Sequence, residues 1–412
     1  MKHNPFTSAT YIAVWSKHFN KAKAPISFEF IENIRFVKHW LLPLHINVGK
    51  NLTKGIDYKL NHSAKDYKGK TFLIYDVPTY FDVEPFSPKP NDSLRLKKMY
   101  QYQGFLMDIS SYENVDEYIN SQFSSKNRRE FRSNQRRLET CFDISYEFIH
   151  GETSKEKFDL IFKQFYDLLS KRFSDKQTNY HHLNPNKWNF YEELVFKMLQ
   201  EKKSSLLIIY NDNQPIGITL NFHSEDILFE TITVFDPDYY KFNIGKLTIV
   251  KIIEWCYENT MAIADFSKGD FDFKHEWCNV VYDFNYHLLY DSKSLISKIL
   301  AYKITLFFKF KLYLRNHHVN ALYRKLLFKL NTKNDEAYNT NFVAEDIDNF
   351  KVDTTFDEID LDDDKVDYIK NFVYSFLFAN PEPLKAIKVY KKKTSKTFMI
   401  VGSQKAQRIT FN

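Results

Sequence analysis

Residues 214–290 read QPIGITLNFHSEDILFETITVFDPDYYKFNIGKLTIVKIIEWCYENTMAIADFSKGDFDFKHEWCNVVYDFNYHLLY and decide the fold of this chain. Apolar runs broken by the turns NDNQ and HSED predict three strands between residues 204 and 235. Apolar residues at helical spacing then predict a helix over 244–258. Two more strands are predicted at AIADFS and at NVVYDFNYHLLY, and we expect the latter to close the sheet.

The residues upstream extend this pattern. FDISYEFI (142–149) alternates as a strand does, and residues 155–172 carry the apolar stripe of an amphipathic helix. A second helix is predicted over 187–201, after a turn. From 142 to 290 the predicted order is therefore β-α-α-β-β-β-α-β-α-β.

The composition excludes several classes of protein. Only 9 of the 412 residues are Gly, which argues against Rossmann and P-loop enzymes because both use glycine-rich phosphate loops. The three Cys are widely separated and suggest neither a metal cluster nor a disulfide framework. We find no signal peptide and no apolar run of ~18 residues, and we expect a reduced, cytoplasmic protein without a metal.

Charge is distributed unevenly along the chain. The net charge of +6 combines a basic stretch and an acidic one. Residues 291–330 hold nine Lys/Arg and one Asp, whereas residues 335–364 hold twelve Asp/Glu and one Lys. The asymmetry separates a basic, aromatic helical segment from an acidic segment of low periodicity, which predicts a linker or a disordered segment.

The motif DFSKGDFDFKHEW at 265–277 groups polar residues after a predicted strand. Ligand sites of α/β proteins form at such strand ends. Asp270 is a candidate to orient an amine or to act as a base, and Lys268 and Lys274 are candidates to hold anionic groups. A structural salt-bridge cluster is the alternative. The adjacent His–Glu pair lacks further ligands at useful spacing, so we predict no zinc site.

The order of elements resembles the GNAT acyltransferase superfamily. The motif is similar to that of its CelD-like branch, which is associated with polysaccharide synthesis and distantly related to Fem-type transferases. The matching positions are Asp265, Lys268, Gly269, Asp270, Phe273, Lys274 and Trp277. Phe replaces the frequent Tyr at 273, so the acid that protonates a leaving thiolate is open, with Tyr239 and Tyr240 as candidates.

The resemblance implies an α+β (α-β-α) fold with a mixed, mostly antiparallel sheet flanked by helices. A second, degenerate GNAT-like half at the N-terminus is a further option. The resemblance also implies acetyl-CoA or another acyl-CoA as co-substrate, and an amino group as acceptor.

A donor of this kind needs a site for its diphosphate. The loop FDPDYYKFNIGK leads into the helix at 244–258, and the N–H groups at a helix start favour anions. A helix start without a ligand is the alternative. The candidate contacts, with Asn243 as the helix cap, are Lys241, Asn243, Ile244, Gly245 and Lys246.

The thioester itself needs hydrogen-bond donors and a base. We expect the strand at 215–222 to offer backbone N–H groups to the thioester oxygen, with Gly217 and Thr219 small enough to leave room. Glu230, among apolar neighbours, is a candidate base. A solvent-facing Glu on an alternating strand is the alternative.

An Arg-rich helix is predicted over 122–139. Arg129, Arg132 and Arg136 share one face of it, which suits an anionic donor or substrate as well as an ordinary solvated surface. The resemblance adds Asp265 and Trp277 as substrate contacts.

The chain divides into five predicted regions. An N-terminal α/β segment at 1–121 precedes the acyltransferase domain with its leading Arg-rich helix at 122–290. A basic, aromatic helical extension follows at 291–334, then an acidic linker at 335–365. A small module of a helix plus strands ends the sequence at 366–412.

Three functional hypotheses remain. The first is an N-acyltransferase in which an amine of a sugar, an envelope precursor or another small molecule attacks the thioester directly. The second is Fem-type transfer from aminoacyl-tRNA, and the third is a non-catalytic binding protein. The acidic stretch disfavours a nucleic-acid partner. Residues 295–330 suit either packing on the domain or contact with an anionic membrane.

Overall fold

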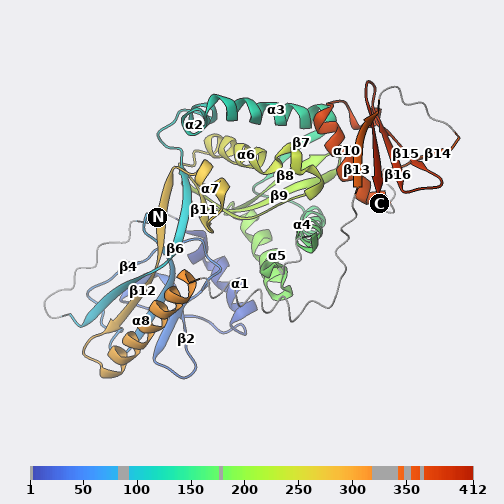
Figure 1. Cartoon of the computed structure of the whole chain (residues 1–412). Coiled ribbons are helices and arrows are strands. Elements are labelled where there is room, and N and C mark those ends of the chain that lie inside the picture. The colour runs from blue at the N-terminus through green and yellow to red at the C-terminus, as the bar shows by residue number, and fades with distance from the viewer. Residues whose placement is uncertain are drawn as a thin grey trace.

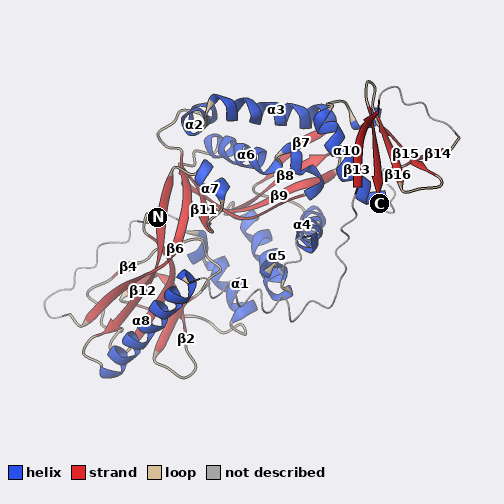
Figure 2. Cartoon of the chain, viewed as in Figure 1, coloured by secondary structure: helices blue, strands red, loops and turns tan. Residues whose placement is uncertain are grey.

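The computed structural model of the chain is shown in Figures 1 and 2. The structure describes residues 3–81, 92–175, 180–317, 342–347, 354–361 and 366–411.

A twelve-stranded sheet forms the centre of the molecule. Its strands are β1 (Ile26–Phe28), β2 (Ile31–Lys38), β3 (Leu44–Asn47), β4 (Lys59–Leu60), β5 (Thr71–Pro78), β6 (Leu94–Asp108), β7 (Ile144–Ile149), β8 (Ser204–Asn211), β9 (Gln214–His223), β10 (Ile227–Phe235), β11 (Ile263–Lys268) and β12 (Val280–Asp291). They follow the order β1-β2-β3-β5-β12-β6-β11-β10-β9-β8-β7, and β4 pairs with β2. Among the described strands, the pairs β3/β5 and β10/β11 are parallel and the others are antiparallel. The mixed, mostly antiparallel sheet is therefore confirmed.

Helices cover both faces of this sheet (Figure 2). They are α1 (Ala9–Phe19), α2 (Val115–Gln122), α3 (Ser125–Cys141), α4 (Lys155–Asp175), α5 (Pro185–Gln200), α6 (Ile244–Glu258), α7 (Asp272–Trp277) and α8 (Leu295–Asn316). One face packs on α1, α4 and α5 through a core that spans the sheet. The other face packs on α2, α6 and α7 near β11, and on α8 near β5 and β12.

The elements from β7 to β12 occur in the predicted order, but the sheet closes differently. β12 does not pair with β11, because β6 lies between them and pairs with both. The expectation that NVVYDFNYHLLY closes the sheet of the 122–290 region is thus wrong. Apolar alternation marks a strand but carries no information about which distant strand will pair with it.

The strand arrangement repeats across the β6–β12 pair. In one half the parallel pair is β3/β5, and in the other it is β10/β11. β6 follows β5 in the chain but pairs with β11. In the same way, β12 follows β11 in the chain but pairs with β5. In the antiparallel register of β6 and β12, Tyr282 pairs with Gly104 and Phe284 pairs with Tyr102. Each half therefore completes its sheet with the other half's last strand.

A smaller sheet follows near the C-terminus. Its strands are β13 (Phe342–Ile347), β14 (Phe356–Ile359), β15 (Lys388–Lys392), β16 (Thr397–Val401) and β17 (Ala406–Phe411), in the order β13-β17-β16-β15-β14. Its helix α10 (Asp367–Ala379) packs against α3 and the 3₁₀-helix η3 (Pro237–Phe242). β13 and β14 lie within the predicted acidic linker, so part of that segment belongs to the C-terminal sheet.

The lengths and hydropathies of the described helices were compared with those of membrane-spanning helices. None of them is both long and apolar enough to cross a bilayer.

Candidate functional site

An opening between β10 and β11 defines the candidate site. The two strands pair at only three positions, ending at Phe229 with Asp265. Beyond this point β10 continues along β9, with a bulge after Glu230, while β11 continues along β6. The two strands therefore separate, and the edge of β10 that faces the opening has no β11 residue in its ladder from Glu230 onward.

Backbone donors for a ligand in this opening come from β10 rather than from β9. Gly217 and Thr219 lie in β9, which pairs with β8 on one side and β10 on the other. The backbone groups of an interior strand are consumed by two ladders. The expectation that residues 215–222 supply free N–H groups is therefore wrong, although Thr219 Oγ1 lies 3.1 Å from Thr233 Oγ1 on β10.

Glu230 stands where the strands begin to separate. Its side chain is half-buried, and the Thr233 hydroxyl donates a hydrogen bond to it. The amines of Lys54 and Lys274 are partly or fully buried nearby, and burial lowers the pKa of both. The negative charge of Glu230 acts in the other direction and raises these pKa values. The carboxylate of the predicted base therefore lies within electrostatic reach of both lysines.

Asp265 lies on the other side of the opening and is fully buried. Its carboxylate accepts hydrogen bonds from the hydroxyls of Tyr80 (2.7 Å) and Tyr282 (2.8 Å) and from the backbone N–H of Ser267 (2.6 Å). Burial raises the pKa of Asp265 to about 6 despite these donors. Asp265 was predicted as a substrate contact, whereas Tyr80, which comes from the N-terminal half, was not predicted.

Lys274 has a different role from the one predicted. Its ammonium is buried and donates to three backbone carbonyls at the end of β11, those of Phe266 (2.6 Å), Ser267 (3.2 Å) and Lys268 (2.8 Å). An ammonium has three N–H donors, and these carbonyls account for all of them. Lys274 thus holds the strand end and is not free to hold a ligand anion.

Lys268 and Asp270 flank this strand end. The Lys268 amine lies 5.1 Å from the centre of the Tyr102 ring. The Asp270 side chain is 78% exposed and lies 2.6 Å from His275 Nε2. Gly269 between them has φ +109°, and a Cβ there would lie 2.7 Å from the Phe271 ring, so this turn requires glycine.

The predicted diphosphate site at the start of α6 is crowded. Asn243 occupies the predicted N-cap position of α6, but it adopts the left-handed conformation (φ 55°, ψ 44°) and its side chain makes no cap hydrogen bond. The Lys246 amine lies 4.7 Å above the Phe131 ring and 3.7 Å from Glu276. The cavity between α3 and the first turn of α6 measures about 30 Å³, room for about one water.

The remaining candidates in this loop also pack within the protein. Ile244 is buried, and a Cβ at Gly245 would lie 3.2 Å from the Phe235 ring. Lys241 is half-buried, with its amine 5.8 Å from the Tyr240 ring. The candidate acid Tyr239 is buried against α10, with its hydroxyl 3.5 Å from that of Tyr374, so it does not face the opening.

The Arg-rich helix keeps its predicted exposed face. Arg129, Arg132 and Arg136 are exposed along α3, and Arg132 lies 3.4 Å from Asp116. The helix begins at Ser125 because the hydroxyl of the preceding serine caps it.

Trp277 is buried rather than open to a ligand. Its ring packs between Phe123 and Phe131, with centroid separations of 4.6 and 5.6 Å. The predicted substrate contact by Trp277 is therefore wrong, because the side chain joins α7 to α3.

Three further basic residues face this region and were not predicted. Burial lowers the pKa of Lys54 to about 8, and the nearby cations Lys268 and Lys274 add to this. Burial and the charge of Lys268 lower the pKa of Lys187 at the start of α5. Burial, then the charge of His181, lowers the pKa of His182 to about 2. No local motif marks these residues, since they come from separate loops and helices.

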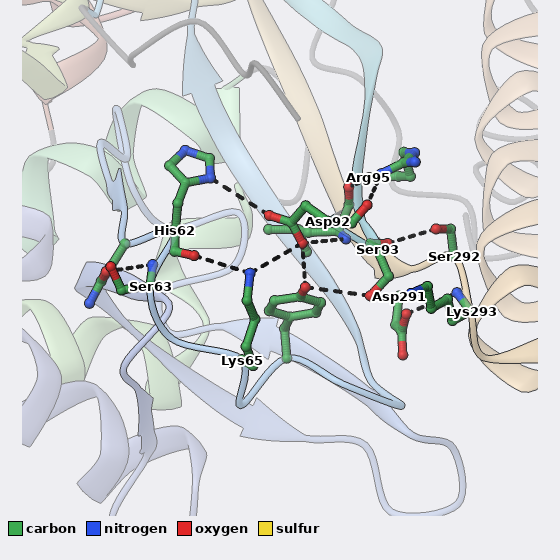
Figure 3. Close-up of polar contacts among 12 residues, drawn as sticks. His62, Ser63, Lys65, Asp92, Ser93, Arg95, Asp291, Ser292 and Lys293 are labelled. Carbon is green, nitrogen blue, oxygen red and sulfur yellow. Dashed lines mark hydrogen bonds and ion pairs between the residues drawn. The ribbon is translucent and has the colours of Figure 1, made fainter. Parts of the chain in front are cut away.

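A second polar network lies at the far end of β6 and β12 (Figure 3). Asp92 accepts from Tyr67 and from Leu94 N, and lies 3.6 Å from the Lys65 amine. Asp291 accepts from the backbone N–H groups of Gly69 and Lys293. Because these carboxylates bind local backbone and side-chain donors, the network fastens the turn before β5 to the sheet.

A cavity with a volume of about 1280 Å³ lies elsewhere. It is lined by α4, the β8–β9 turn, η3 and the C-terminal module, and by none of the predicted catalytic residues. Among the described residues, no group of three His, Cys, Asp or Glu side chains is arranged to hold a metal ion.

Comparison with known proteins finds a family match for part of the chain. Residues 125–275 match the family described as "Acetyltransferase (GNAT) domain". No curated protein matches the sequence.

Three solved structures are similar in fold. A conserved protein of unknown function from Bacteroides thetaiotaomicron has 10% identity and a TM-score of 0.44, covering 70% of this chain and 92% of that one. L-PGS from Bacillus licheniformis has 11% identity and a TM-score of 0.39, with coverages of 74% and 98%. FemX has 12% identity and a TM-score of 0.42, with coverages of 61% and 83%. These values leave the chemistry unassigned, and the similarity to the GNAT acetyltransferase domain family is found over residues 125–275.

Proposed function

We propose that the chain is an N-acyltransferase that moves an acyl group from a thioester donor, acetyl-CoA or another acyl-CoA, to an amine. The observation that carries this proposal is the separation of β10 from β11 between two carboxylates, Glu230 and Asp265. An extended thioester fits such an opening, because the freed edge of β10 can hydrogen-bond to it as a neighbouring strand would.

The chemistry is a direct attack of the amine on the thioester carbonyl. Backbone N–H groups of β10 stabilise the negative charge that develops on the carbonyl oxygen. Glu230 accepts a proton from the attacking amine. Collapse of the tetrahedral intermediate forms the amide and breaks the carbon–sulfur bond. The thiolate leaves and takes a proton from water.

The acceptor belongs to the same proposal. The similarity of the 265–277 motif to CelD-like proteins supports an amino group on a sugar, a cell-envelope precursor or another small molecule. Such acceptors are consistent with a cytoplasmic enzyme.

A second donor class has its own supporting observation. The space between α3 and the start of α6 is about 30 Å³, too small for a diphosphate, while the arginines of α3 face solvent. An exposed basic face suits the phosphate backbone of an aminoacyl-tRNA. Fem-type aminoacyl transfer is therefore the alternative.

Thiol release from a series of acyl-CoA esters, with an amine panel, tests the proposal. We expect Glu230→Gln to lower kcat about 100-fold or more, because it removes the base, while Glu156→Gln on the exposed surface of α4 leaves kcat unchanged. Calorimetric titration with CoA and with aminoacyl-tRNA separates the two donor classes. Absence of both CoA binding and thiol release would refute the acyl-CoA proposal, and tRNA binding would then favour the alternative.

A further inference from the structure

Three consecutive apolar residues are exposed at the tip of the hairpin between β2 and β3. Trp40, Leu41 and Leu42 have exposed fractions of 87%, 68% and 38%. Single exposed apolar side chains are common on protein surfaces, but a run of large ones is unfavourable in water and marks an interaction site. The tip therefore needs a partner that covers it.

Hydrogen bonds hold the tip in this exposed shape. The backbone N–H of His39 donates to the carbonyl of Leu44 (2.7 Å), which closes the hairpin. The N–H groups of the two leucines at the tip both donate to His39 Nδ1 (3.3 Å each). The carbonyl of Pro43 accepts from the N–H of Thr71 (3.1 Å) on β5. The backbone is thus fastened to its own hairpin and to the sheet, which keeps the apolar side chains directed outward.

The start of α8 lies at the same end of the sheet. Leu44, the first residue of β3, pairs with Thr71 of β5, and Thr71 pairs with Tyr290 near the end of β12. Two strand spacings separate Leu44 from Tyr290, which is about 10 Å. The chain then turns into α8 at Leu295. Figure 1 shows α8 and β2 together at this end of the molecule.

The first two turns of α8 enlarge the exposed apolar surface. Leu295, Ile296 and Ile299 are exposed, whereas Leu300 on the same helix is buried against the sheet. The sheet therefore covers one side of the helix and leaves these three residues uncovered. They and the tip at residues 40–42 are hereafter called the apolar end.

Exposed lysines surround the apolar end. Lys38 lies on β2 just before the tip, and Lys298 lies between the exposed isoleucines of α8. Lys68 and Lys293 lie on two loops that Asp291 joins, because its carboxylate accepts from the N–H that follows Lys68 and from that of Lys293 (2.9 Å each). Within the described part of the chain, none of these four lysines forms an ion pair.

We propose that the apolar end inserts into the surface of a lipid bilayer that contains anionic lipids. Tryptophan favours the boundary between headgroups and acyl chains, and leucine and isoleucine bury favourably just below it. The four unpaired lysines complement anionic headgroups, which attract lysines close to the membrane surface. This inference goes beyond acyl transfer, since it concerns where the protein is held and not which group it moves.

Trp40 is a direct probe of insertion. The other tryptophans of the chain are buried or half-buried. With vesicles of phosphatidylglycerol and brominated phosphatidylcholine, we expect the emission of wild type to shift to shorter wavelength and to be quenched by the bromine atoms. Trp40→Phe should still bind these vesicles but lose the quenching. Equal quenching of both proteins would show that the tip stays outside the bilayer and would overturn the proposal.

Vesicle co-sedimentation measures how much the tip contributes to binding. We expect the double variant Trp40→Ser/Leu41→Ser to bind phosphatidylglycerol-containing vesicles at least about tenfold more weakly, because it removes two apolar side chains from the bilayer. Leu160→Ser is the matched control, at a leucine of α4 that is 58% exposed, and should bind as wild type does. Both variants should melt with wild type, since the replaced side chains are exposed.

The proposal is overturned if wild type does not bind these vesicles, or if the folded double variant binds within about twofold of wild type. If wild type instead forms a dimer in analytical ultracentrifugation that the double variant abolishes, the apolar end is a contact between two copies of this chain and the membrane proposal is wrong. These measurements need no acyl donor. Their failure is therefore distinct from an absence of thiol release, which would refute only the acyl-CoA proposal.

Discussion

Asp76 and Asp265 occupy related positions in the two halves of the sheet. Each lies on the second strand of a parallel pair and accepts a hydrogen bond from a tyrosine two strands away, Tyr102 for Asp76 and Tyr282 for Asp265. Asp76 holds the loop that carries Lys50 and Lys54, whereas Asp265 stands in the opening. The same residue pair thus holds the loop after β3 in one half and a carboxylate beside the opening between β10 and β11 in the other.

Gly104 leaves room for the hydrogen bond between Tyr282 and Asp265. Tyr282 crosses β6 to reach Asp265, and a Cβ at Gly104 would lie 2.3 Å from the Tyr282 ring. We expect Gly104→Ala to displace this ring and lower the free energy of unfolding by about 2 kcal/mol. Urea denaturation checks this. Gly217→Ala is the matched control, since its Cβ would meet only ordinary contacts at 3.5 Å, and equal losses in both variants would contradict the assignment.

Asp265 also predicts a pH dependence. Its pKa rises from 3.8 to about 6 on folding, so the folded state binds the proton more tightly. The resulting stabilisation is fully present below pH ~4 and is lost as pH rises through ~6. We expect the free energy of unfolding of wild type, relative to Asp265→Asn, to fall by about 2 kcal/mol between pH 4 and 7. Parallel stability curves for the two proteins would refute the shift.

At the scale of elements, α8 differs from the other helices in its exposed face. It packs on the sheet through Leu300, Ile304 and Phe308. Eight of its other apolar residues are exposed, namely Leu295, Ile296, Ile299, Tyr302, Leu306, Phe307, Phe310 and Tyr313. The helix carries five Lys/Arg and no Asp/Glu. We propose that this face contacts an anionic membrane surface, because basic residues among exposed aromatic and aliphatic side chains suit that interface.

Vesicle co-sedimentation tests the role of α8. We expect binding to vesicles that contain anionic phosphatidylglycerol, and weak binding to neutral phosphatidylcholine vesicles. Each lysine near the surface contributes about 1 kcal/mol, so the triple variant Lys298→Glu/Lys303→Glu/Lys309→Glu should lose the interaction. The same substitutions on Lys388, Lys391 and Lys393 in the C-terminal module are the control. Unchanged binding by the α8 variant would exclude this helix as the contact.

At the scale of the whole molecule, the exchange of β6 and β12 makes the two halves interdependent. β11 pairs with β6 from the first half, and β5 pairs with β12 from the second half. Neither half of the large sheet is therefore complete without a strand from the other half. The core against α1, α4 and α5 is also continuous across both halves. The regions 1–121 and 122–290 are thus joined by strand pairing rather than by a flexible linker.

This interdependence predicts one cooperative unfolding transition for both halves. Hydrogen exchange in increasing urea should show the amides of β5 and β11 losing protection at the same denaturant concentration, because each ladder needs a strand from the other half. Far-UV circular dichroism should give the same midpoint. If β11 exchanged in a separate, earlier transition, the two halves would be independent folding units.

The sequence predicted the parts of the fold that depend on local pattern. Helical periodicity and strand alternation gave the order of elements from β7 to β12, and the capping serine before α3 is a local signal as well. It did not predict the position of β6 between β11 and β12, since strand pairing is a long-range choice among similar apolar strands. Nor did it distinguish Lys274, whose amine satisfies backbone carbonyls, from Lys268, which faces the site.

The chain by itself therefore determined a GNAT-like succession of elements and the positions of Glu230 and Asp265 along it. Only the tertiary structure decided that β10 and β11 separate at these two carboxylates, and that Tyr80 from the N-terminal half donates a hydrogen bond to Asp265. The physical reason is that the periodicity of a helix or a strand depends on residues that are neighbours in the sequence. The electrostatic environment of a site is instead set by side chains that meet only when distant strands pair and helices pack.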